Sequence, residues 1–66
     1  MEEERMMKWF HYEHLPENLQ AVSKPFCDLA DGIVGTLARG AERTVALRKL
    51  LEAKDAAVRA AVSPGG

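Results

Sequence analysis

Apolar residues in the middle of the chain recur at spacings of three and four, the periodicity of one face of an α-helix. The stripe consists of Leu19, Val22, Phe26, Leu29, Ile33 and Leu37. Pro16 precedes it and suits the first turn of a helix. Pro25 interrupts the stripe without changing its phase, so we predict one helix over residues 16–38 that is kinked at Pro25. Two short helices, the second capped by Ser23, are the alternative.

A stronger helical pattern covers residues 42–62, which contain neither glycine nor proline. Its apolar face is rich in alanine, and such small side chains permit tight packing of helices. The face comprises Ala46, Leu50, Ala53, Ala57 and Ala61, flanked by Leu47, Leu51 and Val58. A separate charged face, along which opposite charges can pair, comprises Arg48, Glu52, Asp55 and Arg59.

A turn over residues 39–41 joins the two predicted helices, and Gly40 is expected to supply a positive φ there. Residues 1–15 form an N-terminal arm or short helix, and residues 63–66 form a tail. The pattern therefore predicts an all-α fold, a single domain built as an antiparallel helical hairpin with a short N-terminal arm.

The size of the chain changes this picture, because a domain of 66 residues buries only about 60% of its unfolded surface. The composition is nevertheless 47% apolar, so we predict that the hairpin is a homo-oligomer. Gly32 and Gly35 cost helix stability, and we expect another helix to approach closely there. An intrachain disulfide cannot compensate for the small buried surface, since Cys27 is the only cysteine. The helical pattern around Cys27 predicts a buried structural thiol.

Charge and hydropathy argue against two partner classes. Nine basic and ten acidic residues give a net charge of −1, whereas a protein that binds duplex nucleic acid usually has a basic excess. No apolar run approaches the roughly 20 residues that span a bilayer, and the charged start of the chain does not resemble a secretory signal. We therefore expect a cytoplasmic protein with no membrane partner.

Three of the four aromatic residues and both histidines fall within residues 9–14. Trp9, Phe10 and Tyr12 are candidates to stack on purine bases, with Lys24 or Lys8 supplying charge. The alternative is that this arm packs across a subunit boundary, and the two hypotheses are compatible if a ligand binds at that boundary. His11 and His14 lack a third ligand, so we predict no metal site.

The start of the last predicted helix is a second candidate site. Free backbone N–H groups, guanidinium groups and a hydroxyl suit a phosphate, and Arg39, Glu42, Arg43 and Thr44 lie there. The alternatives are a solvated turn, or an Arg43 that pairs with a carboxylate across an oligomer interface. No nucleophile, base and acid form a catalytic pattern, so we expect neither an enzyme nor a cofactor.

The stretch from Glu42 to Ala56 resembles a family of small phage proteins built on a helical hairpin. The shared pattern is the pair Glu42-Arg43, then Ala46-Leu47, then Leu51-Glu52-Ala53. The preceding segment, from Trp9 to Phe26, is similar to the actinobacteriophage branch of that family. The resemblance covers about residues 8–62.

The family is that of sponges that counter CBASS and Thoeris immunity in bacteria. The resemblance implies a non-enzymatic protein that sequesters cyclic di- or trinucleotides, or cyclic ADP-ribose isomers, in the cytoplasm of an infected host. It implies a hexamer with ligand pockets between protomers. It assigns Glu42, Arg43 and Thr44 to one pocket, and an arm aromatic with a lysine to another. The competing hypothesis is a small obligate helical oligomer that binds another protein and no small ligand.

Overall fold

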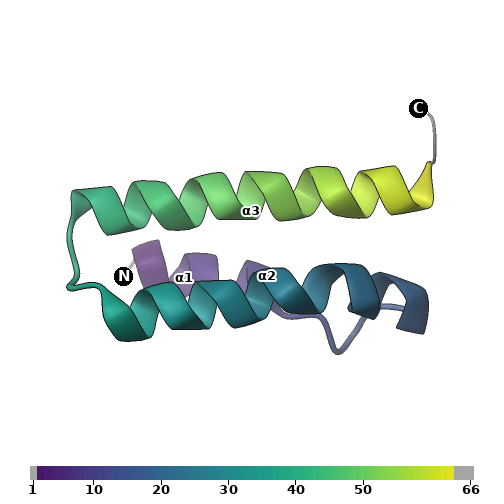
Figure 1. Cartoon of the computed structure of the whole chain (residues 1–66), viewed down its shortest axis with the longest axis horizontal. Coiled ribbons are helices and arrows are strands. Elements are labelled where there is room, and N and C mark those ends of the chain that lie inside the picture. The colour runs from purple at the N-terminus through teal and green to yellow at the C-terminus, as the bar shows by residue number, and fades with distance from the viewer. Residues whose placement is uncertain (1, 64–66) are drawn as a thin grey trace.

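The computed structural model describes residues 2–63, and for residues 2–4 the backbone alone. The described chain is all-α: α1 (Glu2–Met7), the 3-10 helix η1 (Lys8–Phe10), α2 (Glu17–Thr36) and α3 (Ala41–Val62). Figure 1 shows α2 and α3 side by side and antiparallel, with α1 and η1 lying behind them. The all-α prediction is confirmed. Of the predicted tail, residues 64–66 lie outside the described residues.

The two long helices start and end close to their predicted positions. α2 covers residues 17–36 where 16–38 was predicted, and α3 covers 41–62 where 42–62 was predicted. Pro25 lies inside α2, which continues through it without a break. Ser23 does not cap a second helix but sits fully buried within α2, so the alternative of two short helices is wrong.

The core forms where α1, η1, α2 and α3 meet. Its buried side chains are Met6, Phe10, Ala30 and Leu47, and the partly buried residues packed against them are Met7, Phe26, Cys27, Ile33, Val34, Leu50 and Leu51. The N-terminal segment is the described chain before α2, residues 2–16. Its Phe10 is 0% exposed, so this segment supplies the largest fully buried side chain of the hairpin's own core. Burial of an aromatic side chain is one of the largest single contributions to the stability of so small a domain.

The turn over residues 37–40 is held by a side chain of α3. Arg43 is buried, and its Nη1 donates to the carbonyl oxygens of Leu37 (2.7 Å) and Val34 (3.2 Å). The last carbonyls of a helix lack partners within that helix, so Arg43 satisfies two acceptors at the end of α2. Gly40 has a φ of 173°, which is extended backbone, so the predicted positive φ is wrong.

The expected close approach of a helix to Gly32 and Gly35 does not occur within the chain. A Cβ atom added to either residue would meet nothing within 4 Å. Both glycines are exposed. Helical geometry places them on the side of α2 opposite the buried Ala30. Among the described residues, no helix is both long and apolar enough to cross a membrane.

Candidate functional site

Trp9 is the most exposed aromatic side chain among the described residues, at 59%. Phe10, the next residue of η1, is buried in the core, whereas the Trp9 indole stays outside it. Lys8 Nζ lies 5.3 Å from the centre of the indole ring, within the range of a cation–π interaction. An exposed indole next to a cation is a surface on which a flat ring can stack.

Trp9 borders a hollow of about 230 Å³ formed between the N-terminal segment and α3. Arg5, Met6 and Trp9 line it from the N-terminal segment, and Arg48 and Leu51 line it from α3. The two arginines bring planar guanidinium groups to an otherwise apolar hollow. Guanidinium groups bind phosphate and carboxylate through paired N–H donors, so this hollow suits an anionic group.

A second hollow, of about 290 Å³, lies on another side of the same indole. Its lining consists of Lys8, Trp9, His11, His14 and Lys54. Lys54 Nζ donates a 2.6 Å hydrogen bond to the Trp9 carbonyl, which ties the segment to α3. None of the described residues lining either hollow is acidic, and each lining includes two arginine or lysine side chains.

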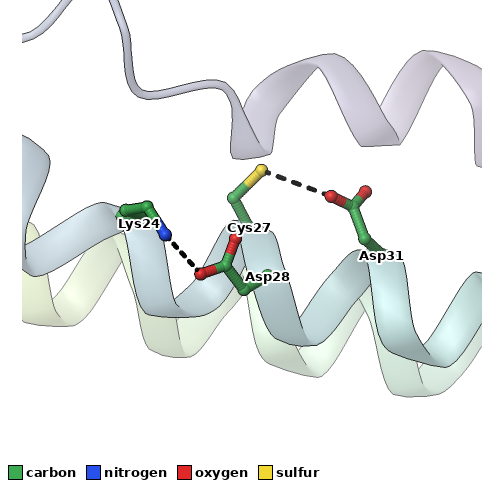
Figure 2. A network of polar contacts seen from close by, with 4 residues as sticks. All are labelled: Lys24, Cys27, Asp28 and Asp31. Atoms are coloured by element: carbon green, nitrogen blue, oxygen red, sulfur yellow. Dashed lines mark hydrogen bonds and ion pairs between the residues drawn. The ribbon is translucent and has the colours of Figure 1, made fainter.

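The structure places Tyr12 and Lys24 apart from Trp9, on the α2 side of the N-terminal segment. Lys24 forms a 2.8 Å ion pair with Asp28, as Figure 2 shows. That hydrogen bond, the Asp28 charge and the nearby Tyr12 hydroxyl all raise the pKa of Lys24. Tyr12 is half-buried. Lys24 is therefore a cation partly neutralised by a carboxylate of its own helix.

Cys27 lies in the same neighbourhood, and Figure 2 shows its thiol pointing toward the N-terminal segment. Burial raises the pKa of the Cys27 thiol, and the carboxylates of Asp31 and Asp28 raise it further. The Cys27 Sγ atom is 3.9 Å from Asp31 Oδ2. Cys27 is partly buried where a buried thiol was predicted. A thiol with a raised pKa stays protonated at neutral pH and is a poor nucleophile, in agreement with a structural role.

The residues predicted at the start of α3 form a third, separate group. Arg39 and Glu42 are exposed, while Thr44 Oγ1 donates to the Gly40 carbonyl at 3.2 Å. Arg43 is 9% exposed, so its side chain does not fit the alternative of a solvated turn. Arg43 and Lys54 are eleven positions apart in α3, which corresponds to about 16 Å along the helix axis. The predicted role of this group in ligand binding stays a prediction.

One predicted ligand residue must be corrected. Phe10 cannot stack on a base, because its ring is fully buried among Met6, Ala30 and Leu47. The residues missed by the sequence analysis are Arg5, Arg48 and Lys54. Arg48, Leu51 and Lys54 are spaced by three along α3, and that spacing is a local signal that they share one side of the helix.

Among the described residues, no group of three or more His, Cys, Asp or Glu side chains is arranged to hold a metal ion. No family model, no curated protein and no solved structure matches this chain.

Proposed function

We propose that this protein binds cyclic nucleotide messengers of bacterial immunity and sequesters them without cleaving them. The ligands are cyclic di- or trinucleotides, or cyclic ADP-ribose isomers, and the effect is to block CBASS or Thoeris effectors in the host cytoplasm. The observation that carries the proposal is the exposed Trp9 indole set between two hollows lined by basic side chains. The resemblance of the α3 sequence to the sponge family supports it as well.

The chemistry of such a ligand matches this surface. A cyclic dinucleotide carries flat bases and two phosphates, and it needs a stacking platform with cations close by. Trp9 supplies the platform, Arg5 and Arg48 supply guanidinium groups on one side, and Lys8 and Lys54 supply ammonium groups on the other. Sequestration requires tight binding and no turnover, so it needs no catalytic group. We also propose that the protein acts as a homo-oligomer, with a hexamer favoured.

Titration calorimetry of the full chain with a panel of cyclic di- and trinucleotides and a cyclic ADP-ribose isomer tests the proposal. We expect binding of at least one ligand, loss of about 1–3 kcal/mol of binding free energy per stacked base in Trp9→Ala, and recovery of the ligand intact by chromatography. Leu37→Ala is a matched control, because Leu37 is a large exposed side chain (49%) in the turn after α2, away from the Trp9 hollows. No heat with any ligand of the panel would refute the proposed function, and a hydrolysed ligand would refute sequestration.

The second candidate function is a protein-interaction module without a small ligand. Exposed apolar side chains favour it, since Leu29 is 55% exposed and Val45 is 47% exposed. The same calorimetry separates the two functions, because a protein-interaction module binds no messenger.

A further inference from the structure

The hairpin has two broad sides, and the N-terminal segment covers only one of them. In Figure 1, α1 and η1 lie behind the plane of α2 and α3, so the side toward the viewer has no third layer. The covered side is identified by Leu51 and Lys54 of α3, which meet Trp9, and by Cys27 of α2, which points toward the N-terminal segment. Helical geometry places the opposite flanks of α2 and α3 on the uncovered side.

These flanks form a continuous apolar surface, which we call the open face. It consists of Val22, Phe26, Leu29 and Ile33 from α2, and of Ala46, Leu50, Ala53 and Ala57 from α3. Leu29 and Ala53 are exposed, and the other members are partly buried. No member of the open face is charged. Absence of charge at the centre of a surface is the composition typical of a protein interface.

The open face has a ridge on one half and a shallow trough on the other. The α2 half carries large side chains such as Phe26 and Leu29, whereas most of the α3 half is alanine. A surface with this division is complementary to itself, because a half-turn brings the ridge of one copy over the trough of another. A different partner would have to present the same division in reverse.

We propose that the open face pairs with the open face of a second copy of this chain, about a two-fold axis parallel to the helices. Each α2 then lies over the α3 of the other copy, and Leu29 packs against Ala53. In each copy, α2 and α3 both gain a second antiparallel neighbour, so the two copies together form a four-helix bundle. This pairing rests on the homo-oligomer of the proposed function, for which it names the contact surface, and it does not rest on the proposed ligand.

The size of the surface fits such a pair. The molecule measures 36 × 22 × 18 Å between its outermost Cα atoms, and a specific interface, which buries roughly 800 Å² per partner, would take up nearly the whole outline of the broad side. The Trp9 hollows lie on the covered side. Pairing therefore leaves both of them accessible.

Sedimentation velocity of the full chain tests the pairing, because one copy has a mass of 7.3 kDa. We expect the wild type to sediment at twice this mass or a multiple of it. We expect Leu29→Glu to reduce the mass at least twofold by placing a carboxylate in the apolar interface. The control is Val62→Glu, because Val62 is 63% exposed but lies at the end of α3 outside the open face, and it should keep the wild-type mass.

A mixing experiment tests the arrangement of α2 over α3. Ala53→Lys alone should also disrupt the pair, and an equimolar mixture with Leu29→Glu should recover the wild-type mass, because the two new charges then face each other. Far-UV circular dichroism follows folding, and recovery of mass and helicity together supports the proposal even if each variant alone is unfolded. A wild-type mass of 7.3 kDa, an oligomer unaffected by Leu29→Glu, or a mixture that does not recover would each overturn it.

Discussion

Trp9 and Phe10 are adjacent in the chain, and η1 sends their rings in opposite directions. The indole is 59% exposed between two basic hollows, and the phenyl ring is 0% exposed in the core. One aromatic side chain thus belongs to the core, while the next is exposed at the candidate site. Alanine substitutions at these two positions should therefore differ strongly in their effect on the free energy of unfolding.

Phe10→Ala should destabilise the protein by about 3–5 kcal/mol, because it removes a buried ring and leaves a cavity. Trp9→Ala should change stability by less than about 1 kcal/mol, since most of the indole is already in water. Urea denaturation of both variants at one protein concentration measures the two effects. Equal losses of stability would show that Trp9 belongs to the core and would undermine its role as a stacking platform.

Ser23 is the described side chain whose burial is hardest to account for. Its hydroxyl is fully buried in α2 and has no hydrogen-bond partner among the described residues. An unpaired buried polar group costs about 1–3 kcal/mol, and alanine nearly matches serine in size. Ser23→Ala should therefore stabilise the protein by about 1 kcal/mol or more.

Helix propensity alone accounts for part of that gain, and the exposed Ala21 of the same helix provides the control. Ala21→Ser should cost about 0.5 kcal/mol, the propensity difference by itself. The midpoint of thermal unfolding compares the two variants. If Ser23→Ala gains no more than Ala21→Ser loses, the buried hydroxyl has a partner such as an internal water.

At the scale of elements, the end of α2 depends on a residue of α3. α2 ends at Thr36, and the Arg43 guanidinium donates hydrogen bonds to the Val34 and Leu37 carbonyl oxygens at this end. A hydrogen bond from a charged donor stabilises more than one from a neutral donor, and Arg43 thereby fixes how α2 turns into α3. The hairpin geometry is held by this contact as well as by the apolar core.

Arg43→Met keeps an apolar stem but removes the donors, and it should cost about 2–3 kcal/mol of unfolding free energy. Arg43→Lys should restore only part of that loss, because an ammonium lacks the planar guanidinium geometry. Chemical denaturation measures both variants, with the exposed Arg59→Met as the control expected to stay within about 0.5 kcal/mol of the wild type. A stable Arg43→Met variant that has lost affinity for an anionic ligand would instead favour the phosphate site predicted from the sequence.

At the scale of the whole molecule, the N-terminal segment completes both the core and the candidate site. It brings Phe10 into the hairpin, and it brings Trp9 next to Arg48 and Lys54 of α3. By lying on one broad side only, it also leaves the other side of the hairpin apolar and open. The proposed ligand site and the proposed pairing surface therefore lie on opposite sides of the α2–α3 layer.

Lys54→Met should loosen the N-terminal segment, because it removes the 2.6 Å hydrogen bond to the Trp9 carbonyl while keeping an apolar stem. Hydrogen exchange should become faster for the amides of residues 5–10 and stay unchanged in the middle of α3. Lys49→Met is the control, since the Lys49 ammonium is exposed and pairs only loosely with Glu52, at 3.8 Å. Unchanged exchange in residues 5–10 would mean that Phe10 burial alone holds the segment.

The sequence by itself determined the helices, because helical periodicity and the positions of glycine and proline are local properties. It predicted α2 and α3 to within two residues at each end, and it placed Arg48, Glu52, Asp55 and Arg59 on an exposed face. Only the tertiary structure decided which arm aromatic is buried and which carbonyls Arg43 binds. The tertiary structure also decided which cations lie around Trp9, since Lys54 and Trp9 are 45 residues apart in the chain. Such contacts depend on how the N-terminal segment packs across the hairpin, and the periodicity of a single helix carries no information about that packing.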